Sequence, residues 1–153
     1  MSTSCTDTDF SALLPPTAFS CIEGWIHDDM PTTDVGGFVV GDKEETADLW
    51  CKSSCIVAGK AYAQAVFDFC GLDVKWECVD GQKVEVSGGK IAIATVSGPC
   101  RKVLMAERTA LNILSRASGV ATVSRAGVEI GKANGWKGSL AGTRKTTPGF
   151  RAV

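Results

Sequence analysis

Apolar and charged residues alternate strictly between positions 74 and 78, and this is the clearest β signal in the chain. The alternation returns at residues 83–86 after an Asp-Gly turn, which predicts a second strand. Residues 90–96 follow a Gly-Gly turn and are apolar on both faces, as is typical of a more central strand. Residues 46–59 predict a further strand, which Ser53 and Ser54 can break.

Helical periodicity separates these strands. Residues 18–25 predict a short amphipathic helix, and residues 61–70 predict another, with its apolar stripe ending at a glycine. Residues 32–45 are rich in glycine and predict a loop with room for one short strand. A sheet with one polar face and helices on the other predicts an α+β sandwich.

A long helix is expected after Ser97-Gly98-Pro99. We expect Gly119 to interrupt it, residues 120–132 to resume the helical pattern, and Asn134-Gly135 to stop it.

Arg108 lies within the first part of this helical pattern. Leu104 precedes it by four residues and Leu111 follows by three, so all three share one face and Arg108 is expected next to the buried side. One interpretation is an arginine whose aliphatic stem covers leucines. The other is a guanidinium held at a cleft or interface to grip a carboxylate or phosphate.

A second candidate site follows residues 138–142, which are small and predict a short buried strand. Arg144 and Lys145 stand among threonines there, Thr146 included, just before a Pro-Gly turn. Adjacent cations and hydroxyls at the carboxyl end of a strand are suited to an anion. A solvated basic turn and a kinase substrate patch remain alternatives.

The charge and composition of the chain limit the partners and the location that we expect for it. The chain has 153 residues, 44% of them apolar, and a formal net charge of −1. This balance gives no reason to expect nucleic acid or a membrane surface as partner. No apolar run approaches the roughly 20 residues that span a bilayer, and the polar N-terminus is unlike a secretory signal, so we expect a cytoplasmic protein.

The cysteines do not predict a metal site. The chain has seven cysteines and one histidine, His27. Cys51 and Cys55 are four residues apart, but no zinc-binding set can be assembled around them. Without a secretory signal the cysteines are expected to be reduced thiols, mostly buried as small apolar side chains.

Two long motifs carry a resemblance to a known family. AERTALNILSRASGVAT at 106–122, followed by AGTRKTTPGFR at 141–151, resembles quinolinate phosphoribosyltransferase, also called carboxylating nicotinate-nucleotide pyrophosphorylase. LLPP at 13–16 and DLWCKSSCIVAG at 48–59 extend the resemblance over nearly the whole chain.

The resemblance implies an α+β fold: an N-terminal open-faced sandwich, an antiparallel sheet with helices on one face, over residues 1–119. Residues 120–153 would then begin a C-terminal α/β barrel that is cut short. The implied reaction joins quinolinate to phosphoribosyl pyrophosphate and releases pyrophosphate and carbon dioxide, giving nicotinate mononucleotide for NAD synthesis. Mg²⁺ would accompany the phosphoribosyl pyrophosphate, with none of its ligands in this chain.

The resemblance also implies roles for four residues. Arg108 would reach into the active site of a neighbouring subunit in a homodimer or larger assembly, and Arg144, Lys145 and Thr146 would contact substrate within the barrel. The implied chemistry needs paired cations more than a nucleophile, so electrostatic positioning would be a sufficient role for these residues. Since later barrel motifs are absent, a second hypothesis is a truncated, catalytically inactive dimerising or interaction protein.

Overall fold

The computed structural model describes residues 10–143 and residue 145. Its main sheet has three antiparallel strands in the order β1-β5-β3, formed by Glu44–Cys51, Ile91–Pro99 and Asp73–Trp76. The predicted central position of the strand at 90–96 is therefore confirmed. A two-stranded antiparallel sheet pairs β2 (Cys55–Ile56) with β4 (Lys83–Val84).

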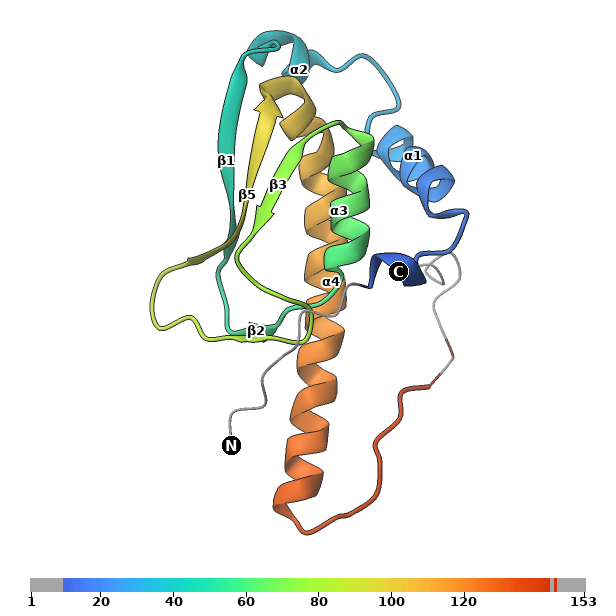
Figure 1. The fold of residues 1–153 in the computed structure, drawn as a ribbon, viewed down its shortest axis with the longest axis vertical. Helices are drawn as coiled ribbons and strands as arrows, with labels where there is room; N and C mark the ends of the chain where they lie inside the picture. Colours follow the sequence, from blue (N-terminus) through green and yellow to red (C-terminus); the bar gives the residue numbers. More distant parts are fainter. Residues whose placement is uncertain (1–9, 144, 146–153) are drawn as a thin grey trace.

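Helices cover one face of the main sheet (Figure 1). The helix α3 (Lys60–Phe69) and the long helix α4 (Cys100–Ala133) lie against the strands, and α1 (Ala18–Asp29) packs on both helices. The short 3-10 helix η1 (Ser11–Leu13) precedes α1. Among the residues that the structure describes, no helix covers the other face of the sheet (Figure 1), so the predicted α+β sandwich with helices on one face is confirmed.

The main core lies between α1, α3, α4 and the sheet. Ile22 of α1 and Val66 of α3 are completely buried there, beside Ala106 and Ala110 of α4. The two alanines leave room for close contact between α4 and its neighbours, because their side chains are small. This core holds α1 and α4 in one fixed arrangement, which matters for Arg108 below.

Residues 32–45 contain a helix that the sequence did not predict. The helix α2 (Val35–Val40) has two glycines among six residues, which explains why the pattern indicated a loop. Asp34 stabilises its start, since its Oδ1 accepts a hydrogen bond of 2.8 Å from the N–H of Gly37. The predicted loop is therefore corrected to a short capped helix followed by β1.

The helix α4 runs without a break through Gly119, so the predicted interruption there is wrong. The Ser118 and Thr122 hydroxyls on either side hold the segment after β1: they accept hydrogen bonds from the N–H groups of Ala58 (3.1 Å) and Ile56 (2.9 Å). One glycine costs a helix only about 1 kcal/mol, and these contacts offset it. No helix in the described part of the chain is long and apolar enough to cross a membrane.

The predicted strand at 138–142 is also wrong, because this segment has no strand pairing in the structure. The chain turns at Gly135 and runs back beside α4 (Figure 1). Trp136 packs over Gly131, and Leu140 packs over Gly127. Two large side chains thus pack against glycines of the helix, and in the described part of the chain no strand lies where it could pair with residues 138–142.

The last third of α4 should exchange its amide hydrogens faster than the first third. Val120, Val123 and Ile130 are 63%, 74% and 65% exposed, whereas residues 106–114 include the buried stripe. Fewer buried contacts lower the local opening free energy. Native-state hydrogen exchange followed by mass spectrometry measures this, and equal protection of residues 120–133 and 103–114 would contradict it.

Candidate functional site

Arg108 lies in the first third of α4, on the side away from the core. Its side chain is 73% exposed, and it lies about half a turn around the helix from the buried Ala106. Leu104 and Leu111, which share its face, are 40% and 37% exposed. The expectation that Arg108 lies next to the buried side is therefore wrong: the alanine stripe faces the core, and the leucines do not.

An ion pair links Arg108 to the end of α1. Its Nη1 lies 3.4 Å from Oδ1 of Asp29, a carboxylate whose side chain is 25% exposed. Asp28 and Asp29 are the last residues of α1, where the helix dipole is negative and carboxylates are unfavourable. Arg108 supplies the cation that offsets this charge. No local pattern in the sequence indicates the pair, because 79 positions separate its members.

A small hollow adjoins this pair. Trp25, Asp28 and Asp29 of α1 and Thr109 and Asn112 of α4 line a space of about 290 Å³. Thr109 is the buried polar residue of this wall, only 7% exposed. The arrangement can offer a guanidinium and two carboxylates to a polar group, and it contains no thiol or imidazole that could act as a nucleophile.

Asp29→Asn should change the free energy of unfolding by less than about 1 kcal/mol. The Arg108 side of the ion pair is 73% exposed, so the pair contributes little, and removing a carboxylate from a helix C-terminus offsets the loss. Urea denaturation followed by circular dichroism measures the change. A destabilisation of several kcal/mol would show that Asp29 supports the fold beyond its contact with Arg108; Asp28→Asn is the matched control.

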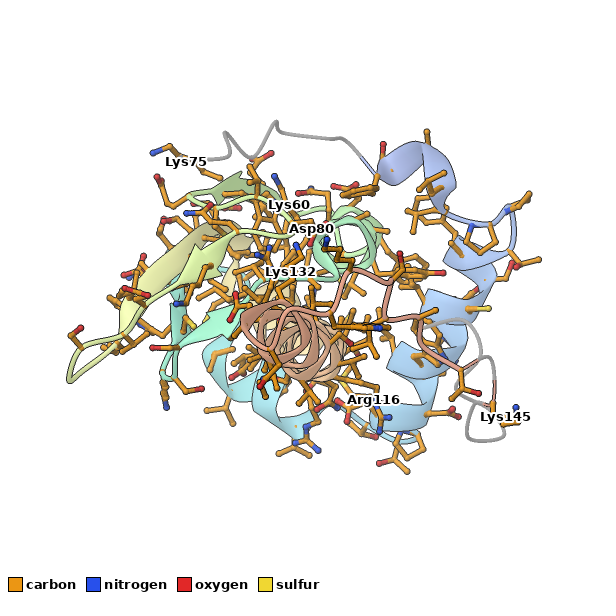
Figure 2. All side chains as sticks on the ribbon, turned by 90° about the horizontal axis from the view of Figure 1, so that it is seen from below. Lys60, Lys75, Asp80, Arg116, Lys132 and Lys145 are labelled. Carbon is orange, nitrogen blue, oxygen red and sulfur yellow. The ribbon has the colours of Figure 1, made fainter. Side chains whose placement is uncertain are left out.

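The second predicted site is described only in part. Arg144 and Thr146 lie outside the described residues. Lys145 is exposed, and both its backbone N–H (3.3 Å) and its Nζ (3.5 Å) contact the Oγ1 of Thr143. In the view along α4, Lys145 lies at the periphery of the molecule (Figure 2). None of its described contacts joins it to Arg108.

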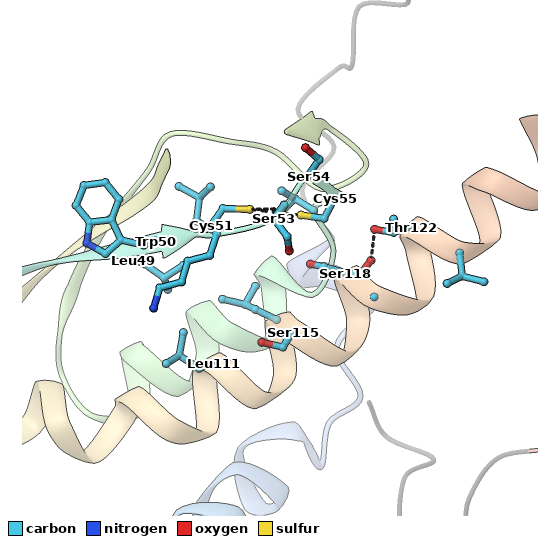
Figure 3. A pocket seen from close by; sticks show the side chains of 16 residues that line it. Leu49, Trp50, Cys51, Ser53, Ser54, Cys55, Leu111, Ser115, Ser118 and Thr122 are labelled. Atoms are coloured by element: carbon cyan, nitrogen blue, oxygen red, sulfur yellow. Dashed lines mark hydrogen bonds between the residues drawn. The ribbon is translucent and has the colours of Figure 1, made fainter. Parts of the chain in front are cut away.

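A groove runs between the start of the β1–β2 connection and α4 (Figure 3). It has a volume of about 520 Å³ and is lined by Trp50, Cys51 and Cys55 on one side and by Leu111 and Ser118 on the other. In the described part of the chain, no group of three or more His, Cys, Asp or Glu side chains could hold a metal ion.

Comparison with known proteins decides the family. The sequence pattern described as quinolinate phosphoribosyl transferase, N-terminal domain, matches residues 29–118, more than half of the chain. The chain belongs to this family. The match includes Arg108, its partner Asp29 and both cysteines of the groove.

Curated relatives of this quinolinate phosphoribosyl transferase domain are about twice as long as this chain. The chain is 38% identical over 142 residues to the nicotinate-nucleotide pyrophosphorylase [carboxylating] of Rattus norvegicus and 39% identical to that of Homo sapiens. Each match covers 92% of this chain, but 46% and 47% of the relative. The chain thus spans about half the length of the curated relatives it matches.

Solved structures show the same fold. The nicotinate-nucleotide pyrophosphorylase from Francisella tularensis is 30% identical, with a TM-score of 0.80 over 95% of this chain and 51% of that chain. The protein of the same name from Ehrlichia chaffeensis is 23% identical, with a TM-score of 0.74, and supports the fold alone. The α+β arrangement described above is therefore the family's fold for this segment.

Proposed function

We propose that this chain contributes the N-terminal domain of a phosphoribosyltransferase that converts quinolinate and phosphoribosyl pyrophosphate to nicotinate mononucleotide, pyrophosphate and carbon dioxide. Residues 1–119 would form this domain and residues 120–153 would begin the barrel. The match over residues 29–118 and the names of the relatives support the proposal. A cytoplasmic location is part of the proposal.

The observation that carries the proposal is the setting of Arg108. Its guanidinium is exposed, tethered by one ion pair and flanked by two half-exposed leucines. Apolar side chains around a cation favour a surface that another subunit covers, because burial of the leucines favours association while the arginine reaches a ligand. In a homodimer or larger assembly, Arg108 would enter the neighbouring subunit's site.

The chemistry needs cations more than a nucleophile. Quinolinate carries two carboxylates and its cosubstrate carries phosphates, and a guanidinium binds either in a bidentate geometry. Arg108 would hold a substrate anion from one subunit, while Arg144, Lys145 and Thr146 would hold substrate groups from the barrel of the other. Mg²⁺ would arrive with the phosphoribosyl pyrophosphate, and no step here depends on a metal held by the described residues.

The proposed reaction is tested with a fusion that restores the relatives' length. Residues 1–153 are joined to the part of the Homo sapiens relative that follows its matched segment, and nicotinate mononucleotide is measured after adding quinolinate, phosphoribosyl pyrophosphate and Mg²⁺. We expect product, and we expect none without quinolinate. A fusion that is folded by circular dichroism and assembled, but makes no product, would contradict the proposal.

A second candidate function rests on exposed apolar residues of α4, namely Val120, Val123 and Ile130. A surface of this kind suits a dimerising or interaction protein without activity of its own. Size-exclusion chromatography of the chain with and without the full-length relative distinguishes the two. A mixed species that lowers the relative's activity would favour this candidate, and the absence of a mixed species would count against it.

A further inference from the structure

Two thiols meet at the edge of the groove beside α4. Cys51 ends β1 and Cys55 begins β2, with Lys52, Ser53 and Ser54 between them. Their Sγ atoms lie 3.6 Å apart, and both side chains are partly exposed. Figure 3 shows the two sulfurs pointing toward each other at the lip of the groove. In the described part of the chain, no other cysteine pair has this contact.

The backbone around both thiols is held in place. Cys51 is paired with Ile91 in the main sheet, and Cys55 is paired with Val84 in the small sheet. The residue after Cys55 donates its N–H to Thr122 of α4 at 2.9 Å. Because these contacts fix the two backbones, the thiols remain close without the entropy loss that a flexible pair would incur.

We propose that Cys51 and Cys55 form a dithiol site that a hydroperoxide oxidises reversibly to an intramolecular disulfide. A disulfide needs the sulfurs at about 2.05 Å, and side-chain rotation across a three-residue connection can bring them from 3.6 Å to this separation. The proposal does not depend on the phosphoribosyltransferase activity.

The two thiols are oxidised to the disulfide in two steps. The thiolate of Cys51 attacks one oxygen of the hydroperoxide, the O–O bond breaks, and the products are a sulfenic acid and water or an alcohol. Cys55 then attacks the sulfenic sulfur, the S–S bond forms, and hydroxide leaves and takes a proton to become water. The two sulfurs lose two electrons in total, and the peroxide gains them.

The environment of Cys55 assigns the order of these steps. Burial, followed by the hydrogen bond with Cys51 and the nearby charges of Cys51 and Cys78, raises the pKa of the Cys55 thiol to about 11. Cys55 is therefore mostly protonated at neutral pH and reacts slowly with peroxide. Cys51 is the thiol oxidised first, and Cys55 resolves the sulfenic acid once it forms beside it.

Neighbouring cysteines are less suited to this role. Burial is the main cause that raises the pKa of Cys70 and of Cys78 to about 11, and both side chains are about 5% exposed. Cys78 donates to the carbonyl of Ile93 instead of to a thiol. Cys21 and Cys100 are partly exposed, as Cys51 is, but neither has a thiol neighbour in the described structure.

The disulfide would change the groove. Lys52, Ser53 and Ser54 line its mouth, and Ser54 also accepts the N–H of Val86 at 2.9 Å. Closing a ring across these residues would shorten the connection between the two sheets and fix the mouth. Oxidation would therefore change the shape of the groove between the β1–β2 connection and α4.

Trypsin separates the two cysteines, because Lys52 lies between them. The chain is treated with hydrogen peroxide, its remaining thiols are blocked with iodoacetamide, and it is digested without reductant. Peptides 44–52 and 53–60 should then appear as one joined species, about 2 Da lighter than the sum of the two separate thiol peptides because two hydrogens leave. Dithiothreitol should separate them again.

Variants supply the controls. In Cys55→Ser, Cys51 should proceed to irreversible sulfinic acid, because no thiol resolves it, whereas Cys21→Ser should give the same joined peptides as the unsubstituted chain. The proposal is overturned if Cys51 pairs with Cys78 or with another molecule, or if Cys21 and Cys100 oxidise to the same extent while peptides 44–52 and 53–60 stay separate.

Discussion

Arg108→Ala is expected to lower kcat/KM for quinolinate by about 100- to 1000-fold in the assembled fusion enzyme, a loss typical of removing one well-placed charged or hydrogen-bonding group. The variant should fold normally, because Arg108 is 73% exposed and only its ion pair with Asp29 is lost. Steady-state kinetics with quinolinate varied at saturating phosphoribosyl pyrophosphate measures the effect.

Two further variants show whether the effect belongs to Arg108. Arg125→Ala removes another exposed arginine of α4, one that pairs with Glu129, and should leave kcat/KM unchanged. Arg108→Lys should recover only part of the loss, because an ammonium cannot reproduce a bidentate guanidinium contact. Equal kinetics for Arg108→Ala and the unsubstituted fusion would refute the role of Arg108 in substrate binding.

Ile22→Ala should destabilise the fold by about 2–5 kcal/mol, the range found when a large buried aliphatic side chain is truncated to alanine. Ile22 is completely buried between α1, α3 and α4. Its loss leaves a cavity at the contact that holds α1, and with it Asp29, against α4. Urea denaturation of the isolated chain measures the change in the free energy of unfolding.

Phe19→Ala is the matched control for Ile22→Ala. Phe19 lies on the same helix but is 53% exposed, so its truncation should cost well under 1 kcal/mol. Similar losses for both variants would show that α1 is not packed as described. The comparison matters for function because the end of α1 supplies the carboxylate that contacts Arg108.

The sheet was predictable because its strands are encoded locally. Alternation at residues 74–78 and a two-sided apolar run at 90–96 predicted β3 and the central β5, and turn glycines marked their ends. The helix at 61–70 followed from its stripe in the same way. In each case the periodicity and the burial agree, so local and tertiary preferences do not conflict.

Tertiary contacts decided the remaining features. Gly119 looks like a helix break, but Ser118 and Thr122 tie this part of α4 to the segment after β1. Residues 138–142 look like a buried strand, but Trp136 and Leu140 pack instead on glycines of α4. Arg108 was found by its motif, yet its orientation was not, because Leu104 and Leu111, which share its face, lie outside the buried stripe of α4.

The roles of Arg144, Lys145 and Thr146 remain predictions. They were identified by residue type and by resemblance, and the described structure includes only Lys145 of the three. Asp29 and the Cys51–Cys55 contact were found only in the structure, because their geometry depends on the packing of α1 against α4 and on the two sheets. A distant carboxylate and two thiols four residues apart carry no local signal for such contacts.

The central claim, that Arg108 acts in the active site of a neighbouring subunit, is tested most directly by mixing two inactive fusion enzymes. One carries Arg108→Ala and keeps its barrel residues; the other carries Lys145→Ala and keeps Arg108. After subunit exchange, mixed dimers should contain one complete site, and up to about a quarter of the unsubstituted activity should return if exchange is random. Native mass spectrometry confirms that mixed dimers form. Mixed dimers that stay as inactive as their parents would contradict the account.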